Sequence, residues 1–313
     1  MHIAIYILLA LLMLLLVSGG YVFVVACVRR KELPWLIEDE IKKTSYGKHY
    51  ESILFGDRFL REHNAQDVYI KNRDGLRLHA LWVPVENAKG TMLFAHGYRS
   101  SKLVDFSLAY PMYHAFGMNI LVPDQRSHGE SEGKYITFGV KESCDMQEWI
   151  TYHNHVYGEI SIILSGLSMG ASTMLYLADQ KLPQNVKGII ADCGFTSPWD
   201  ILSHVFRSVV HLPAGLTLWA TELFARLFAG FSLKERDTRT ILRNSRLPVL
   251  MVHGTGDGFV PCDMTKQAYA VCAEPKELLL VDGAEHGLSF LVQREKYTQL
   301  VQEFLKKYVE ADK

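Results

Sequence analysis

The sequence has no excess of charge of either sign. It holds 33 lysine and arginine residues against 34 aspartate and glutamate residues, which leaves a formal net charge of −1 over 313 residues. Proteins that bind nucleic acid usually concentrate lysine and arginine to neutralise phosphates. The balance of charge therefore excludes nucleic acid and strongly acidic molecules as expected partners.

Cysteine is scarce, and the patterns that indicate a disulfide framework or a metal centre are absent. The odd number of thiols, their wide spacing and the lack of a CxxC or Cys/His ligand pattern favour structural thiols in a reducing compartment. The five are Cys27, Cys144, Cys193, Cys262 and Cys272. We therefore expect neither a metal nor an organic cofactor.

Charge is missing altogether from one long apolar stretch, residues 3–28 (IAIYILLALLMLLLVSGGYVFVVACV). As a helix with a rise of about 1.5 Å per residue, this stretch exceeds the roughly 30 Å of a bilayer's hydrocarbon core. Arg29, Arg30 and Lys31 follow it directly, whereas a cleavable secretory signal carries its basic residues before the apolar part. We expect residues 1–30 to be a single transmembrane anchor, with the rest of the chain in the cytoplasm by the positive-inside rule.

The same stretch has a second interpretation. The segment "VVAC", Val24 to Cys27, resembles the lipobox of bacterial lipoproteins, which would place the remaining chain outside the cell on a lipidated Cys27. Because basic residues follow the stretch rather than precede it, the transmembrane interpretation is favoured. The lipid anchor stays as the alternative.

After the anchor, the pattern of apolar residues changes twice. Residues 31–66 mix apolar and charged residues with a helical period, which predicts an amphipathic connector. Residues 67–84, "DVYIKNRDGLRLHALWVP", then alternate around an Asn-Arg-Asp-Gly turn, as a β-hairpin does. From residue 67 to residue 313, short apolar runs of strand type alternate with helical patterns. This order predicts one α/β domain, with a mostly parallel sheet flanked by helices.

One interval, about residues 198–240, breaks the alternation because no strand can be picked out in it. Its pattern predicts two or three short helices, interrupted by Pro213 and Gly215, that form a cap. The interval holds more large apolar residues than one buried stripe requires. Candidates for the wall of a hydrophobic substrate pocket, with packing of the cap on itself and on the sheet as the alternative, are Phe206, Trp219, Phe224 and Phe228.

A serine between glycines stands at the predicted junction of a strand and a helix, in "SIILSGLSMGASTMLYLAD". The pentapeptide from Gly166 to Gly170 has the form G-x-S-x-G, the sharp turn that presents a nucleophilic serine above a sheet. The two glycines let neighbouring backbone approach the turn, and the amino terminus of the helix favours a developing anion. These features predict that Ser168 is a nucleophile rather than a helix cap.

A serine nucleophile needs a base and an acid, expected after it in the order Ser, Asp, His. The stretch "VLMVHGTGDGFVP" supplies Asp257 after one predicted strand, and "LLLVDGAEHGLSF" supplies His286 after the last one. The carboxyl ends of parallel strands share one edge of a sheet, so the three side chains are expected to meet there. Asp192 and Asp282 are lower-ranked candidates for the acid.

Two backbone amides are expected to form an oxyanion hole for the tetrahedral intermediate. One belongs to Met169, and the other to Tyr98, which follows His96 and Gly97 in "LFAHGYRSSK". A further loop at the same edge, "VPDQRSHGES", carries polar residues for which a structural role is favoured over contact with substrate: Asp124, Arg126 and His128.

Taken together, "HGYRSS", "DQRSHGES", "GLSMGA", "HGTGDGFVP" and "GAEHG" resemble the α/β-hydrolase superfamily, from about residue 67 to the end. Within it they look most like the bacterial branch related to prolyl-aminopeptidase-like and acylaminoacyl-peptidase-like serine hydrolases. The resemblance implies an eight-stranded sheet with a small helical cap after the sixth strand, and a catalytic triad of Ser168, Asp257 and His286. The propeller or large cap usual in the peptidases is missing, and substrate does not transfer on this scaffold.

The sequence therefore predicts a serine hydrolase that cleaves small carboxylic esters, through an acyl-enzyme, without a cofactor. The apolar cap and the neighbouring bilayer favour hydrophobic acyl esters, lipid-derived ones included. An aminopeptidase or acyl-peptide hydrolase is the first alternative; it needs a carboxylate for the substrate ammonium, for which Glu222 and Glu235 are weak candidates. A non-catalytic binding protein is the second, although a binder has no need of the complete set of catalytic residues.

Overall fold

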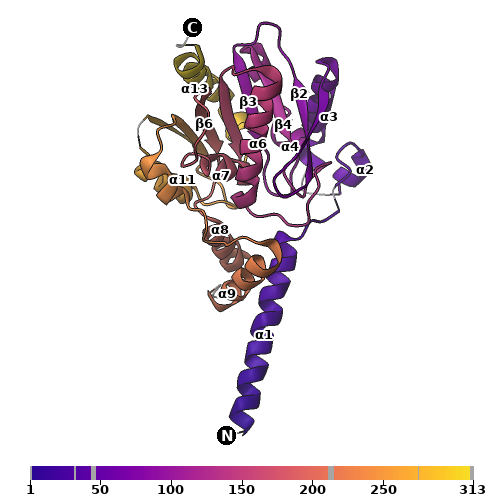
Figure 1. Ribbon diagram of the computed structural model, residues 1–313, viewed down its shortest axis with the longest axis vertical. Helices are drawn as coiled ribbons and strands as arrows, with labels where there is room; N and C mark the ends of the chain where they lie inside the picture. Colours follow the sequence, from indigo (N-terminus) through magenta and orange to yellow (C-terminus); the bar gives the residue numbers. More distant parts are fainter. Residues whose placement is uncertain (1, 32, 44–46, 211–214, 274, 311–313) are drawn as a thin grey trace.

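A twisted sheet of eight strands forms the centre of the molecule (Figure 1). The computed structural model describes residues 2–31, 33–43, 47–210, 215–273 and 275–310. Across the sheet the order is β1-β2-β4-β3-β5-β6-β7-β8; β2 runs antiparallel to both of its neighbours, and the other adjacent pairs are parallel. This confirms the mostly parallel, eight-stranded sheet. The strands are β1 Gln66–Lys71, β2 Arg77–Val83, β3 Gly90–Ala95, β4 Met118–Pro123, β5 Ile162–Leu167, β6 Val186–Asp192, β7 Val249–Gly254 and β8 Lys276–Val281.

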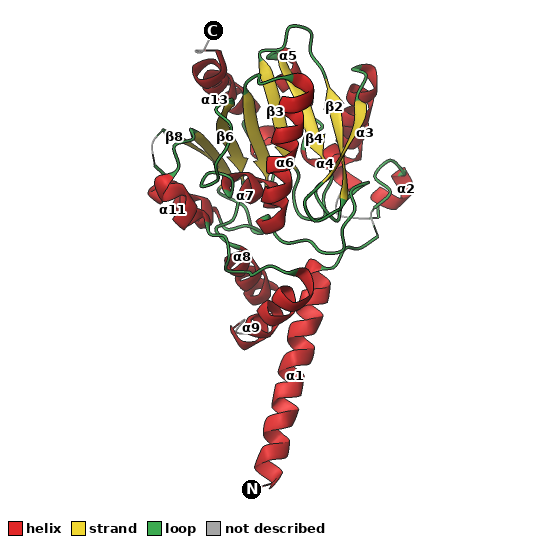
Figure 2. Ribbon diagram, in the orientation of Figure 1, coloured by secondary structure: helices red, strands yellow, loops and turns green. Residues whose placement is uncertain are grey.

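Helices cover both faces of the sheet (Figure 2). Successive side chains of a strand point to opposite faces, so Met92 and Phe94 of β3 pack in one core and Leu93 and Ala95 in the other. The first core is closed by α5 (Tyr110–Ala115) and α13 (Arg294–Leu305). The second is closed by α6 (Val140–Tyr157), α7 (Met169–Leu175) and α11 (Cys262–Val271). Two one-turn helices, α4 (Lys102–Asp105) and α12 (Ser289–Val292), lie in loops beyond the carboxyl ends of the strands.

The predicted connector is helical where the structure describes it. It contains α2 (Glu38–Ile41), a 3-10 turn (Gly47–His49) and α3 (Tyr50–Glu62). Helix α3 packs against α4 and α5, and it does so closely, because a Cβ on Gly56 would lie 2.2 Å from the Cβ of Ser107. The segment is therefore part of the first helical layer, where it helps to enclose the site described below.

The cap lies between β6 and β7, as predicted. It comprises α8 (Pro198–Val205), a π-turn (Phe206–Val210), α9 (Gly215–Phe224) and a second π-turn, η3 (Ala225–Ala229), before α10 (Thr238–Ile241) and a 3-10 turn (Leu242–Asn244). Helix α9 begins at the predicted break, Gly215, whereas Pro213 lies outside the described residues. In Figure 1 the cap stands apart from the sheet, beside a long helix that continues past it.

That long helix is α1 (His2–Cys27). Among the described residues it is the one helix long and apolar enough to cross a membrane, and a signal sequence would pass the same test. It is exposed over most of its length. Its carboxyl-terminal part packs against the cap, and Gly19, Phe23, Ala26 and Cys27 are buried.

Candidate active site

Ser168 stands at a strained turn between β5 and α7. Its φ of 56° lies in the left-handed region, which a residue with a side chain rarely adopts. The glycines on either side are required by close contact: a Cβ on Gly166 would lie 2.2 Å from the carbonyl oxygen of Gly170, and one on Gly170 would lie 1.8 Å from that of Ala95. The turn therefore holds the serine at the carboxyl edge of the sheet, as the motif predicts.

The three residues of the predicted triad meet at this edge. His286 lies in the loop after β8, and its Nε2 is 2.9 Å from the Oγ of Ser168. The Nδ1 of the same ring is 2.6 Å from Oδ2 of Asp257, which lies in the loop after β7. A base within hydrogen-bond reach of a hydroxyl, and itself oriented by a carboxylate, is the geometry that activates a serine.

The carboxylate of Asp257 is buried and accepts hydrogen bonds on both oxygens. The amides of Phe259 and Val260 each donate to Oδ1 at 2.9 Å, while the rings of His286 and His253 contact Oδ2 at 2.6 and 3.1 Å. Burial alone would raise the pKa of this carboxyl, but the hydrogen bonds from His253 and His286 outweigh it and hold the pKa well below its usual range. Asp257 is therefore a fixed negative charge beside the imidazole.

The two lower-ranked acids have other partners. Asp282 is exposed and accepts a hydrogen bond from Thr255 at 3.1 Å. Asp192 is buried, accepts a hydrogen bond from Ser289 at 3.1 Å, and has its pKa raised to about 6 by burial. Neither carboxylate has a hydrogen bond to His286 among the described contacts. His253, by contrast, was not singled out from the sequence, although it lies only four residues before Asp257 and packs against it.

The loop predicted to carry the second oxyanion donor runs beside the serine. A Cβ on Gly97 would lie 3.4 Å from the Cβ of Ser168, so the backbone before Tyr98 passes directly next to the nucleophile. Asp105 of α4, which the sequence analysis did not single out, fixes this loop. It accepts hydrogen bonds at 2.5 Å from both the amide of Gly97 and the hydroxyl of Ser100.

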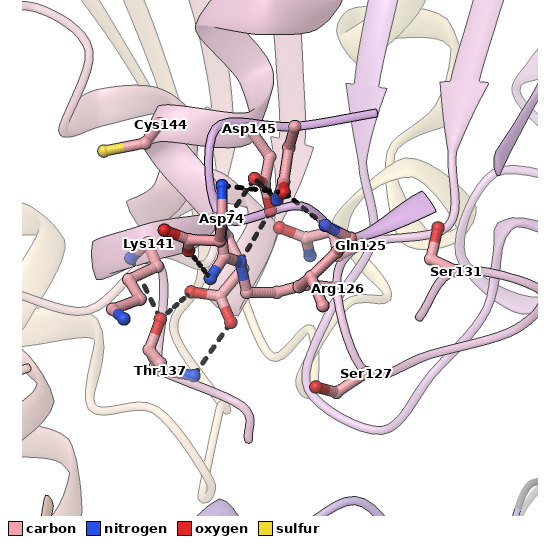
Figure 3. A network of polar contacts seen from close by, with 12 residues as sticks. Asp74, Gln125, Arg126, Ser127, Ser131, Thr137, Lys141, Cys144 and Asp145 are labelled. Atoms are coloured by element: carbon pink, nitrogen blue, oxygen red, sulfur yellow. Dashed lines mark hydrogen bonds and ion pairs between the residues drawn. The ribbon is translucent and has the colours of Figure 1, made fainter. Parts of the chain in front are cut away.

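The polar loop after β4, which carries Asp124, Arg126 and His128, contacts the loop beside the serine. The ring of His128 accepts the amide hydrogen of Arg99 at 3.1 Å, and burial lowers the pKa of His128 to about 3, so the ring is neutral. Arg126 lies between two carboxylates (Figure 3). Its guanidinium donates to Asp145 at 2.6 Å and to Asp74 at 2.8 Å. These contacts fit the favoured structural role of the loop. None of its residues lines the cavity beside Ser168.

A cavity of about 500 Å³ opens over the serine, within the range of small-molecule sites. Besides Gly97, Tyr98, Ser168 and His286, its lining includes the charged residues Arg99, Asp105 and Asp192. Its apolar wall comes from four places in the chain: the segment after α4, β5, the loop after β7, and the segment around α12. The large side chains of this wall are Phe106, Tyr113, Leu167, Phe259, Leu288, Phe290, Leu291 and Tyr297.

The structure corrects the prediction that four residues of the cap line the substrate pocket. None of Phe206, Trp219, Phe224 and Phe228 lines this cavity. The rings of Phe224 and Phe228 instead lie 6.2 and 6.1 Å from that of Phe23 on α1, and Trp219 contacts Trp199 within the cap. Apolar periodicity in a helix predicts that one face is buried, but it does not identify the surface that packs against that face. Here α1 packs against part of it.

The carboxyl end of α1 is joined to the loop beside the serine. The hydroxyl of Tyr98 donates to the carbonyl of Ala26 at 2.8 Å, and the guanidinium of Arg99 donates to the carbonyls of Val25 and Val28 at 2.6 and 3.1 Å. Val25 and Ala26 belong to the last turn of α1, whose carbonyls have no partner within the helix. The cavity and the apolar helix therefore lie on the same side of the molecule.

Two groups of described residues bring three metal-ligand atoms within 4.8 Å of one another. One is Cys193 with Asp257 and His286, in which both ring nitrogens of the histidine already have partners and burial raises the pKa of the thiol well above its usual value. The other is Asp67, His79 and Glu130, whose histidine contacts Asp124 and Asp67. Their engaged nitrogens make both groups poor metal sites.

Comparison with known sequences points to one fold. A family model described as alpha/beta hydrolase fold matches residues 90–235, a range that includes Ser168. Protein YqkD of Bacillus subtilis is 27% identical over 232 residues, covering 74% of this chain and 76% of YqkD. Protein YfhR of Escherichia coli K12 is 23% identical over 230 residues, covering 71% and 74%.

Solved structures agree with the sequence comparison. The esterase Pf2001 of Pyrococcus furiosus aligns with a TM-score of 0.66 and 23% identity, over 80% of this chain and 96% of the esterase. The alpha/beta hydrolase GrgF from Penicillium sp. sh18 aligns with a TM-score of 0.63 and 20% identity, over 79% of this chain and 99% of GrgF. At this level of identity, the likeness establishes the fold.

Proposed function

We propose that this chain, which has the α/β-hydrolase fold, is a serine hydrolase of carboxylic esters. One observation carries the proposal: the imidazole of His286 lies between Ser168 and Asp257, at 2.9 and 2.6 Å. The serine would otherwise be too weak a nucleophile at neutral pH. Both contacts are short enough for proton transfer and for control of the tautomer.

In the acylation step, the Oγ of Ser168 attacks the ester carbonyl while Nε2 of His286 takes its proton. The oxyanion formed on the carbonyl oxygen is stabilised by the amides of Met169 and Tyr98. Collapse of this intermediate breaks the bond to the alcohol oxygen, which receives the proton from His286. Asp257 stays ionised and stabilises the imidazolium.

In the deacylation step, a water molecule gives its proton to Nε2 of His286 and attacks the acyl carbonyl. The second intermediate collapses with return of the proton to the Oγ of Ser168, which releases the carboxylic acid. The two steps together consume one water molecule and involve no redox change.

The substrate class follows from the cavity wall. Aromatic and leucine side chains dominate the wall beside Ser168, which suits the apolar chain of an acyl group. The contacts of Tyr98 and Arg99 with the end of α1 support placing the cavity towards the membrane. Hydrophobic esters, lipid-derived ones included, would reach the cavity from there.

The placement in the membrane is part of the proposal. Residues 1–30, which include helix α1, act as a single-pass anchor, and residues 67–313 form the catalytic domain. Arg29, Arg30 and Lys31 favour the cytoplasmic side. A lipid anchor on Cys27, with the domain outside the cell, is the alternative. Digestion by a protease added to intact cells separates the two, because only the external domain would be cleaved.

Cleavage of peptides is the weaker alternative. An aminopeptidase needs a carboxylate that is available to the substrate ammonium, but Glu222 accepts hydrogen bonds from Arg226, Ser232 and Leu233. Glu235 accepts one from the amide of Ser232 at 3.1 Å. Neither glutamate lines the cavity. Two aspartates do, but Asp105 accepts hydrogen bonds from Gly97 and Ser100 and Asp192 accepts one from Ser289, which favours esters.

A fluorophosphonate probe tests the proposal, since it labels an activated serine. We expect labelling of the full chain, no labelling of Ser168→Ala, and full labelling of the control Ser208→Ala, an exposed serine of the cap. Failure of the wild type to react, or equal labelling of Ser168→Ala, would exclude a serine hydrolase. Turnover of aminoacyl amides without turnover of p-nitrophenyl esters would favour the peptidase. A probe-reactive serine without any turnover would favour a binding protein on this fold.

A further inference from the structure

The cap helix α9 has a surface that matches the membrane rather than the catalytic domain. We propose that α9 and η3 lie within the bilayer leaflet next to the domain, packed beside α1. The membrane-binding surface is then a pair of helices instead of one. This inference rests on the placement of α1 in the membrane proposed above.

The first observation is a row of large apolar side chains along α9 and η3. Residues 216, 219, 223 and 227 follow one another by three or four positions, so they share one face of the helix. Leu216 is 72% exposed, Leu227 is 68% exposed, and the neighbouring Phe228 is 57% exposed. Trp219 contacts Trp199 and Lys234 on one side, but the row as a whole stays largely exposed among the described residues. A contiguous apolar surface on a protein marks a contact with a membrane or a partner.

The charges of the segment fit the same environment. Within the fifteen residues from Gly215 to Ala229, only Glu222 and Arg226 are charged. They form an ion pair at 2.5 Å, and the glutamate is otherwise satisfied by Ser232 and the amide of Leu233. An unpaired charge inside a bilayer is costly, and this segment has none.

The contact between α1 and α9 has the composition of a contact between membrane helices. A Cβ on Gly19 would lie 2.3 Å from the Cβ of Ala220, so the two backbones approach as closely as glycine permits. The hydroxyl of Thr221 donates to the carbonyl of Gly19 at 3.2 Å. Small residues and hydroxyl bonds between helices are what holds helices together in lipid.

The length of α1 supplies an independent argument. Its freely exposed apolar part, Ile3 to Val17, is fifteen residues and spans about 22 Å, whereas the hydrocarbon core is about 30 Å thick. The remaining distance of about 8 Å in the hydrocarbon core corresponds to about five helical residues, which must be Ser18 to Val22. Ala220 and Phe224 of α9 contact Gly19 and Gly20 at this level, so α9 lies at bilayer depth whenever α1 spans the core.

Aromatic and basic side chains mark the edge of this surface. The ammonium group of Lys234 lies 3.6 Å from the ring centre of Trp219 and 3.9 Å from that of Trp199. Tryptophan rings gather at the boundary between lipid and water, and lysine reaches from there to the headgroups. Lipid is thus the occupant that fits the exposed row, its charges and its border together.

Fluorescence quenching in vesicles tests the inference on the full chain. An environment-sensitive dye is attached to Leu223→Cys or Leu227→Cys, with Leu12→Cys on α1 as the reporter of the anchor. Each is made in a Cys144→Ser background, because Cys144 is the partly exposed native thiol. Val156→Cys on α6 is the matched control, since Val156 is 48% and Leu223 45% exposed. The vesicles contain phosphatidylcholine and phosphatidylglycerol.

We expect lipid-borne nitroxide to quench positions 12, 223 and 227 several-fold more than position 156, and aqueous iodide to quench only position 156. Quenching of position 12 by lipid but of 223 and 227 by iodide would overturn the inference and leave the anchor standing. Iodide quenching of position 12 would overturn the anchor, and the inference with it. Protection of 223 and 227 from both quenchers, with disulfide cross-linking between copies of Leu223→Cys, would show that a second copy covers the row and would also overturn the inference.

Discussion

The substitution Asp257→Asn separates the orientation of His286 from the packing of its loop. The amides of Phe259 and Val260 donate to Oδ1, and an asparagine carbonyl keeps both bonds. The change falls on Oδ2, which lies 2.6 Å from Nδ1 of His286 and 3.1 Å from Nε2 of His253. His253 keeps the carbonyl of Val260 as a second partner at 3.0 Å. An amide nitrogen in the place of Oδ2 donates where the carboxylate accepted. The imidazole of His286 then adopts the tautomer in which Nδ1 accepts this hydrogen bond and Nε2 carries the hydrogen.

That tautomer cannot take the proton of Ser168, because Nε2 already holds one at 2.9 Å from Oγ. The fixed negative charge that stabilises the imidazolium is lost as well. Together the two losses are expected to lower kcat by about 10⁴-fold, which corresponds to about 5 kcal/mol of transition-state stabilisation. KM should change little, since Asp257 has no place on the cavity wall.

The assay is steady-state hydrolysis of a p-nitrophenyl ester by the full chain in detergent or vesicles, with thermal unfolding measured in parallel. Asp282→Asn is the control, because this exposed aspartate is closer to His286 in sequence and hydrogen-bonds Thr255. We expect Asp282→Asn to keep wild-type kcat. An Asp257→Asn protein that folds and keeps kcat within tenfold of wild type would refute the assignment of the acid.

Three further predictions follow from the same contacts. Gly170→Ala should lose more than about 3 kcal/mol of stability or fail to fold, because the new Cβ would lie 1.8 Å from the carbonyl oxygen of Ala95; Gly258→Ala, which meets nothing within 4 Å, should unfold like wild type, and a stable Gly170→Ala would contradict the close approach. Asp105→Ala should lower kcat by about 10²- to 10³-fold with a smaller change in KM, because it frees the amide of Gly97 and the hydroxyl of Ser100 beside the proposed oxyanion hole. Equal effects on both constants would count against a positioning role. Asp192 has its pKa raised from 3.8 to about 6 by burial, so the folded state binds the extra proton between these values and the free energy of unfolding falls as the pH rises from about 4 to about 6. Asp192→Asn should abolish that fall and gain about 3 kcal/mol at pH 7 in denaturant titrations, and an unchanged pH slope would refute the cause.

The parts of the site that the sequence predicted are those that depend on local order. The sharp turn at Ser168 is specified by one pentapeptide between a strand and a helix, and the structure has the turn at that place. Asp257 and His286 follow directly on β7 and β8, and parallel strands deliver their carboxyl ends to one edge. Each placement required only the identity of the strand that precedes the residue.

The parts that the sequence did not predict depend on which surfaces meet. Phe224 and Phe228 belong to the excess of large apolar residues in the cap, which suggested a pocket, but both pack near Phe23 of α1. The cavity wall instead combines Phe106 with Phe290, which are far apart in the chain and approach only when the helices dock. No periodicity encodes that approach.

Asp105 illustrates a second limit of sequence analysis. It is one acid among 34 Asp and Glu residues, and nothing in "SSKLVDF" distinguishes it from a solvated helix residue. Its role comes from the two hydrogen bonds at 2.5 Å, to Gly97 and Ser100, which exist only after the loop has folded back. An acid a few residues after the predicted oxyanion glycine is the one signal that would have singled it out.

The most direct test of the account is to capture the covalent intermediate. The full chain is mixed with p-nitrophenyl butyrate, quenched with acid within the first turnover, digested and analysed by tandem mass spectrometry. The account predicts one butyryl group on Ser168 and a matching burst of p-nitrophenol, both absent from Ser168→Ala. A butyryl group on another residue, or hydrolysis in which Ser168 is never acylated, would contradict it.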